Sequence, residues 1–127
     1  MKVVPHDEVE QKTVEMPGAV GCRVRQLIGE EDGAKNFSMR HFEVEEGGHT
    51  PLHSHPYEHE IFVVEGFGAA IDGNREWTIE RGDVIYVAPG DVHQFKNMGD
   101  GPLSFLCLIP NSAANLPITQ HPEYELE

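Results

Sequence analysis

Basic residues are scarce in this sequence, and their scarcity restricts the partners that the protein can bind. Its 127 residues contain 9 lysines and arginines against 22 aspartates and glutamates, which gives a formal net charge of −13 at pH 7. An electric field of this sign repels the phosphates of nucleic acids and the anionic headgroups of lipids. We therefore expect neither a nucleic acid nor a membrane surface among its partners.

Long hydrophobic runs are missing as well. No apolar stretch approaches the roughly 20 residues that a membrane-spanning helix needs. Residues 1–5 form too short an opening segment for a signal peptide. The sequence thus predicts a cytoplasmic protein.

Cysteine is rare, since only Cys22 and Cys107 occur. They lack C-x-x-C spacing, so a zinc ribbon is not indicated, and a single pair offers no disulfide framework. Free thiols behave as small apolar groups and pack well inside proteins. We expect both cysteines to be reduced and buried.

Helical periodicity is also lacking, and short apolar or alternating segments take its place. Such segments include residues 37–44, 61–65 and 103–109, and turn signals such as that at residues 72–74 separate them. Strands spaced at about 8 to 12 residues indicate an antiparallel sandwich or barrel. We predict an all-β fold in a single domain, because a chain of this length encloses one core.

Three parts of the chain differ in character. Residues 1–17 show a weak alternation that a Pro-Gly pair ends, which suggests an N-terminal strand or arm. Residues 18–110 carry the strand pattern of the barrel. Residues 111–127 lose the alternation and form a polar, acidic C-terminal tail, which could pack on the barrel or stay mobile.

Three histidines stand close together in GGHTPLHSHPYEHEIFVVEG, residues 47–66. Side chains alternate across a strand, so His53, His55 and His59 have the same parity and can project from one face. Glu60 would face the other way. The spacing favours a shared metal ion, and a fourth ligand must come from elsewhere in the chain.

His93 is the candidate for that fourth ligand, because it follows a Pro-Gly turn at the mouth of a predicted strand. The other histidines lack a partner at a spacing of two: His6, His41, His49 and His121. The candidate metal ligands are therefore His53, His55, His59 and His93. Since each imidazole must be neutral to bind, the sequence alone predicts metal loss towards about pH 5.

Arg40 lies in an unusual position. Grouping Phe42 and Val44 on the inner face of an alternating strand places Arg40 on the same face. A buried guanidinium needs an acidic partner or an anionic ligand, because an unpaired charge away from water is costly. A structural ion pair, an outward side chain at a bend and a substrate-binding role all remain open.

Two motifs in this sequence resemble those of the cupins, a family of small β-barrels. The first cupin motif is G(X)5HXH(X)3-4E(X)6G, which Gly47, His53 and His55 match, with a glycine at position 66 or 68 near its end. The resemblance covers roughly residues 20 to 110.

The second cupin motif, G(X)5PXG(X)2H(X)3N, matches in register except that its proline is displaced by one position, to Pro89. The matching residues are Gly82, Gly90, His93 and Asn97. A larger departure lies in the first motif, where His59 stands in place of the expected glutamate and Glu60 fits only the longer spacing. In this respect the chain looks like the single-domain cupins with four histidine ligands, several of which carry manganese.

The resemblance implies a jelly-roll antiparallel β-barrel that binds one divalent metal ion per chain. Manganese is the first expectation, and iron, nickel, copper or zinc stay open because imidazole suits them all. Four neutral ligands do not cancel the charge of the ion, so we expect an anionic or oxygen-chelating small molecule as substrate. Cupins of this size generally pair through their N-terminal strands, which implies a homodimer formed through residues 1–17.

On this resemblance we expect an enzyme, namely a mononuclear metal-dependent oxidoreductase similar to a dioxygenase that cleaves a C–C or C=C bond. The alternatives are a non-redox isomerase or lyase that uses the metal as a Lewis acid, and a metal- or ligand-binding module without turnover. Arg40 and Glu60 are the candidate catalytic residues. Phe95, Phe105 and Cys107 are candidate pocket-lining residues, and Cys107 could also supply a thiol ligand.

Overall fold

The computed structural model describes residues 1–121, so the prediction for residues 122–127 of the tail lies outside the described part of the chain. Strands make up most of this part, with three short 3-10 helices between them. In chain order the elements are η1 (His6–Glu8), β1 (Gln11–Thr13), β2 (Val20–Ile28), η2 (Glu30–Asp32), β3 (Phe37–His49), β4 (His53–Ser54), β5 (His59–Glu65), β6 (Phe67–Ile71), β7 (Glu76–Glu80), β8 (Val84–Val87), β9 (Gln94–Asn97), β10 (Leu103–Pro110), η3 (Asn111–Asn115) and β11 (Thr119–Gln120).

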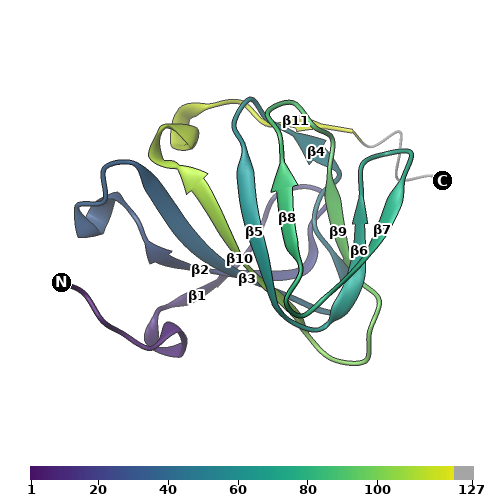
Figure 1. The fold of residues 1–127 in the computed structure, drawn as a ribbon, viewed down its shortest axis with the longest axis horizontal. Coiled ribbons are helices and arrows are strands. Elements are labelled where there is room, and N and C mark those ends of the chain that lie inside the picture. The colour runs from purple at the N-terminus through teal and green to yellow at the C-terminus, as the bar shows by residue number, and fades with distance from the viewer. Residues whose placement is uncertain (122–127) are drawn as a thin grey trace.

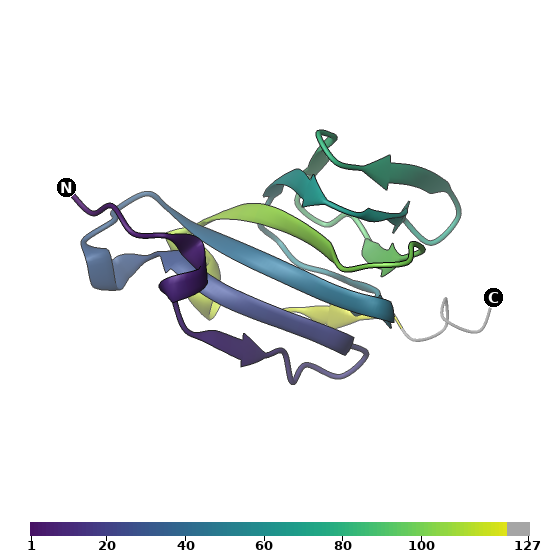
Figure 2. The same ribbon diagram turned by 90° about the horizontal axis from the view of Figure 1, so that it is seen from below.

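Nine strands form one antiparallel sheet, whose main path runs β7-β6-β9-β3-β10-β5-β8. Strand β2 pairs with β3 and β1 pairs with β2, while β4 and β11 form a separate two-stranded sheet. The large sheet curls on itself, and the β6–β7 hairpin arches over the layer that contains β2 and β3 (Figures 1 and 2). The all-β prediction is confirmed, in the form of a curled half-barrel whose main path ends at β7 and β8.

The inner face of this sheet carries the hydrophobic core. On β5, Ile61 and Val63 are buried whereas Phe62 is exposed, as the period of two requires. On β10, Leu103 and Phe105 are buried in the same cluster. Burial of each such side chain contributes about 1.5–3 kcal/mol. Both cysteines are buried free thiols, as predicted.

The two ends of the chain pack on the sheet. Strand β1 pairs with β2 of the same chain, from Gln11 opposite Arg25 to Thr13 opposite Arg23. At the other end β11 pairs with β4, and the side chain of Asn111 bonds to that of Ser38. The described part of the predicted tail is thus attached to the barrel. No helix in residues 1–121 is long and apolar enough to cross a membrane.

Candidate metal centre

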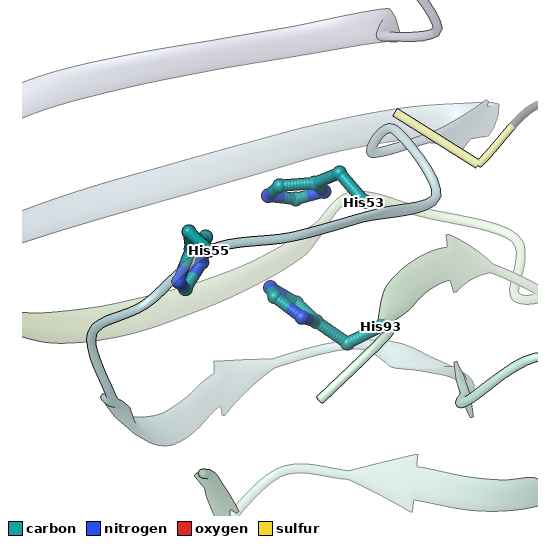
Figure 3. A group of neighbouring side chains, drawn as sticks. All are labelled: His53, His55 and His93. Atoms are coloured by element: carbon teal, nitrogen blue, oxygen red, sulfur yellow. The ribbon is translucent and has the colours of Figure 1, made fainter. Parts of the chain in front are cut away.

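Three of the four predicted ligands meet at one point inside the curled sheet. The ligand atoms of His53, His55 and His93 all lie within 4.8 Å of one another. Figure 3 shows the three rings converging, with His93 arriving from a separate segment of the chain. All three side chains are buried. Their geometry could hold a metal ion.

Backbone hydrogen bonds hold the main chain of the three histidines in place. His53 and His93 form an isolated antiparallel bridge between β4 and the segment before β9. The turn before His93 is tied to the same segment, since the N–H of Gly90 donates to the carbonyl of His55 over 2.8 Å. Gly90 has a φ of 85°, a left-handed value that glycine adopts without strain.

Hydrogen bonds at Nδ1 fix the tautomers of these rings. Nδ1 lies 2.8 Å from the carbonyl oxygen of Pro51 in His53, 2.8 Å from that of Tyr57 in His55, and 2.9 Å from that of Asp91 in His93. Because a carbonyl only accepts, each Nδ1 carries the proton and each Nε2 keeps its lone pair. The Nε2 atoms of His55 and His93 are buried and have no hydrogen-bond partner among the described residues. Such unpartnered lone pairs fit a metal ion.

His59, at the start of β5, lies beside this group. Its ring centroid is 4.4 Å from that of His55 and 5.2 Å from that of His93, and its Nε2 is also buried without a partner. It does not belong to the group whose ligand atoms are all within 4.8 Å. The structure therefore brings all four histidines into one cluster, with three in a tight group and His59 at its side.

Burial keeps the clustered imidazoles neutral. Loss of hydration lowers the pKa of His53, His55 and His93 below the usual value of 6.5, that of His93 to about 3. Burial and the charge of Arg40 lower the pKa of His59 strongly. Neutral rings compete for a cation across a wide pH range, so we now expect metal loss to begin at a lower pH than the sequence alone predicts.

A cavity of about 250 Å³ opens beside the histidines. Its walls include His53, His59 and His93 together with Arg40, and the remainder is largely apolar. The apolar and aromatic residues in the wall include Val14, Met16, Val24, Phe42, Tyr57, Phe95, Phe105 and Ile118. The predicted pocket residues Phe95 and Phe105 thus lie in the wall. A cavity of this kind suits a small substrate with an apolar body.

Arg40 is the cation in that wall. Its Nη2 donates a hydrogen bond to Sγ of Cys107 over 3.4 Å, and its guanidinium lies 4.8 Å from the centre of the Phe42 ring. Its Nε is buried and has no hydrogen-bond partner in the part of the chain that the structure describes. Within residues 1–121 no carboxylate lies within ion-pairing distance of Arg40. Within residues 1–121 Arg40 thus forms no ion pair, and it lines the cavity instead of pointing outward. Its role in substrate binding stays a prediction.

The structure places two other candidates differently. Glu60 is exposed on the outer face of β5, where its position borders grooves whose described lining contains no histidine. Cys107 is buried behind the cavity wall, with Sγ 3.3 Å from Nδ1 of His59. The group of three converging ligand atoms contains no sulfur. Burial raises the pKa of the Cys107 thiol, although the neighbouring Arg40 opposes this.

Sequence reasoning missed Tyr57. Its ring stacks on that of His55 with centroids 3.9 Å apart and planes 5° from parallel, and its carbonyl orients the same imidazole. Burial raises the pKa of its phenol. Tyr57 lies in the loop between β4 and β5, where alternation is lost, so no periodic signal in the sequence identifies this contact.

Comparison with known proteins gives the family of the chain. Residues 40–109 match the family model described as the cupin domain. The polyketide cyclase RemF from Streptomyces resistomycificus has a similar structure, with a TM-score of 0.88 and 33% identity, over 94% of this chain and 84% of that one. A predicted oxalate decarboxylase from Thermotoga maritima has a TM-score of 0.76 and 27% identity, over 86% of this chain and 98% of that one.

A curated relative, 1-methylthio-D-xylulose 5-phosphate methylsulfurylase from Rhodospirillum rubrum, is 31% identical over 85 residues, which are 67% of this chain and 54% of the relative. The chain spans about half the length of the curated relatives that it matches. These neighbours differ in function but agree in fold. Since the family model covers more than half of the sequence and the curled all-β fold agrees with it, the chain belongs to the cupin domain family, Cupin_2.

Proposed function

We propose that this protein is a mononuclear metal-dependent cupin enzyme that binds one divalent ion through His53, His55, His59 and His93. The observation that carries the proposal is that Nε2 of His55, His59 and His93 is buried without a hydrogen-bond partner in residues 1–121, within one histidine cluster. Leaving buried polar atoms unpaired costs about 1–3 kcal/mol each. A bound cation would satisfy all of them together.

Manganese is our first choice of metal, by resemblance to the four-histidine cupins. Iron, nickel, copper and zinc fit imidazole ligands as well. When bound, a divalent ion would supply a Lewis acid that polarises a carbonyl or enol oxygen of the substrate. Elemental analysis of protein purified without added metal tests the metal assignment. We expect one equivalent of a divalent metal per chain. A protein that contains no metal and does not bind added metal would contradict the proposal.

The substrate that the cavity favours is small, with an apolar or aromatic body and an anionic oxygen. The aromatic walls formed by Phe42, Phe95 and Phe105 would hold the body. The guanidinium of Arg40, which has a buried Nε without a partner, would hold the anionic oxygen through charge-assisted hydrogen bonds. Substrates of this class include enolisable carbonyl compounds and aromatic hydroxy acids.

For the reaction we favour a non-redox conversion of an enolisable carbonyl substrate, such as a cyclisation or isomerisation. The similarity to a polyketide cyclase at 33% identity over most of both chains supports it. In such a reaction Arg40 would hold the enolate oxygen, and the phenol of Tyr57, which lies in the same wall, could exchange a proton with the substrate. The apolar wall would exclude water from the reactive anion.

Oxidative cleavage of a C–C or C=C bond, as in a dioxygenase, is the second candidate. An oxygen electrode separates the two candidates. Oxygen uptake that requires both substrate and a redox-active metal, and that zinc does not support, favours cleavage, whereas turnover with zinc and no oxygen uptake favours the non-redox reaction.

We also propose, by resemblance, that the protein forms a homodimer through residues 1–17. In this structure β1 pairs with β2 of its own chain, so dimerisation through the arm would require β1 to exchange or to extend its pairing. Solution scattering tests this, and a mass equal to one chain at all concentrations would contradict it.

A further inference from the structure

One of the four candidate ligands is held differently from the other three. Nδ1 of His53, His55 and His93 faces a backbone carbonyl two residues away, so a local turn sets each tautomer. For His59 the partner is a side chain from a distant strand. Its Nδ1 lies 3.3 Å from Sγ of Cys107, which is 48 residues further along the chain.

Strand register places a third side chain against the same sulfur. Cys107 of β10 stands opposite Ile61 of β5 on one side and opposite Arg40 of β3 on the other. Nη2 of Arg40 lies 3.4 Å from the sulfur. A guanidinium has only donors, so the sulfur of Cys107 is the acceptor in this contact. The thiol therefore stands between the cation of the cavity wall and the fourth imidazole.

We infer that Cys107 is a positioning residue that orients His59 and Arg40 together. Its sulfur accepts hydrogen bonds from Nδ1 of His59 and from the guanidinium of Arg40. The first bond leaves the lone pair of His59 on Nε2, toward the metal, and the second fixes the remaining N–H groups of Arg40 toward the cavity. This inference rests on the proposed metal-binding function.

The alternative direction of the first bond would have the opposite effect. A thiol that donated its proton to Nδ1 would leave the ring proton of His59 on Nε2 and block coordination. The accepting role is the one compatible with coordination, because it leaves the lone pair of His59 on Nε2, which is buried without a hydrogen-bond partner among residues 1–121. His59 also lies outside the tight group of three, so its contribution depends on this contact more than that of the other ligands does.

Titration with Co²⁺, followed by visible absorption, tests the inference. Replacing a group that orients a metal ligand typically weakens metal binding about 10- to 100-fold. We expect a loss of this size for Cys107→Ala and recovery of most of the affinity for Cys107→Ser, whose hydroxyl oxygen accepts two hydrogen bonds. Equal affinities of wild type and Cys107→Ala would overturn the inference.

Cys22→Ala is the matched control. Cys22 is the other buried thiol, and its sulfur contacts the backbone carbonyl of His49 at 3.1 Å rather than a ligand ring. We expect it to lower stability while leaving the Co²⁺ affinity unchanged. If Cys22→Ala weakened Co²⁺ binding as much as Cys107→Ala, a general packing effect would replace the positioning role.

A double-mutant cycle isolates the path through His59. Because Cys107 acts on the metal through His59, Cys107→Ala should cause no further loss of Co²⁺ affinity in a His59→Ala background. The same loss in both backgrounds would contradict positioning through this imidazole.

The tautomer of His59 can be read without any metal. In ¹⁵N spectra of the metal-free protein we expect the proton on Nδ1 in wild type, and a shift towards Nε2 in Cys107→Ala. A wild-type ring protonated on Nε2 overturns the inference even if the protein binds metal. If instead the protein binds none of Co²⁺, Mn²⁺ and Zn²⁺, the proposed metal-binding function is wrong. The ¹⁵N spectra alone then decide whether Cys107 sets the tautomer of His59.

Discussion

The backbones of His53 and His93 bond to each other in both directions. The N–H of His53 donates to the carbonyl of His93 over 3.1 Å, and the N–H of His93 donates to the carbonyl of His53 over 2.9 Å. These bonds join the two cupin motifs at the point where their imidazoles converge. Because main-chain atoms make the bridge, either imidazole can be removed without breaking it, so metal binding and folding can be tested separately.

Removal of the His93 imidazole should abolish tight metal binding while the protein stays folded. We expect His93→Ala to weaken binding of Mn²⁺ or Zn²⁺ at least about 100-fold, because only His53 and His55 of the tight group would remain. Calorimetric titration of metal-stripped protein measures the affinity. His6→Ala serves as control, since His6 is exposed in η1 and is not part of the histidine cluster. An unchanged affinity of His93→Ala would refute its role as a ligand.

Substitution of Glu60 should leave the site intact. Its side chain is exposed on the face of β5 opposite to that of His59 and Ile61. We expect Glu60→Gln to retain the metal content and the turnover of the wild type within about twofold, as for surface substitutions in general. Metal analysis and an activity assay on the same preparation measure this. A loss of more than tenfold in either would assign Glu60 to the site despite its exposure.

Substitution of Arg40 should weaken substrate binding without unfolding the protein. Salicylate is a suitable probe because it is aromatic, anionic and oxygen-chelating. Since a hydrogen bond to a charged group is worth about 1.5–3 kcal/mol, we expect Arg40→Met to bind salicylate roughly 10- to 100-fold more weakly in the metal-loaded protein. The free energy of unfolding should be equal or higher, because the buried and unpaired Nε disappears.

Arg23→Met controls for the loss of a positive charge. Arg23 is exposed and pairs with Glu45 at 3.3 Å on the outside of the sheet. It should bind salicylate like the wild type. Equal salicylate affinities of Arg40→Met and Arg23→Met would remove the anion-binding role of Arg40.

Acid should destabilise the metal-free protein in a defined pH window. A histidine in the unfolded chain has a pKa of about 6.5, whereas burial lowers the pKa of His53, His55 and His59 in the folded state and that of His93 to about 3. Below pH 6.5 these histidines are therefore protonated in the unfolded chain but stay neutral in the folded chain. The free energy of unfolding should fall as the pH decreases from about 6.5 towards about 3.

Urea denaturation in the presence of a chelator, at a series of pH values, measures this dependence. Replacement of His93 by glutamine removes one of the titrating groups, so the slope of stability against pH should become smaller in this variant. A slope that is flat between pH 6.5 and 4, or unchanged by the substitution, would contradict burial of neutral imidazoles.

Part of the site could be predicted from residue periodicity. Alternation on β5 correctly places Ile61 and Val63 inside and Phe62 outside, and the parity argument puts Arg40 on the face that borders the cavity. Parity in the sequence predicts one shared face for His53, His55 and His59, although Pro56 and Tyr57 interrupt the alternation. The structure instead ends β4 at Ser54 and starts β5 at His59, so a turn and not continuous alternation brings the third ring to the cluster.

The other contacts of the site depend on how strands pair, which residue periodicity does not predict. Parity places Cys107 on the inner face of β10, but its contact with His59 follows from the register between β10 and β5. Stacking of Tyr57 on His55 arises in the loop after Pro56, where alternation is lost. The arm could pair with its own β2 or with that of another copy, because an edge strand offers the same backbone groups to either.

Asn97, the last residue of the second motif, should support the fold and not the metal. Its buried side chain donates to the carbonyls of Val44 at 2.9 Å and Gly101 at 2.7 Å, and accepts from the N–H of Gly99 at 2.9 Å. These bonds tie the β9–β10 turn to β3. Because each buried group left unpaired costs about 1–3 kcal/mol, Asn97→Ala should lose roughly 2–4 kcal/mol of unfolding free energy.

Metal affinity separates this role from that of His93, four residues earlier on the same segment. At a temperature where Asn97→Ala is folded, its affinity for Mn²⁺ or Zn²⁺ should equal that of the wild type, because the bridge between His53 and His93 is retained. Asn74→Ala, an exposed asparagine in the β6–β7 turn, should change neither quantity by more than about 0.5 kcal/mol. Lost metal binding in folded Asn97→Ala would mean that the β9–β10 turn, and not the backbone bridge, sets the position of His93.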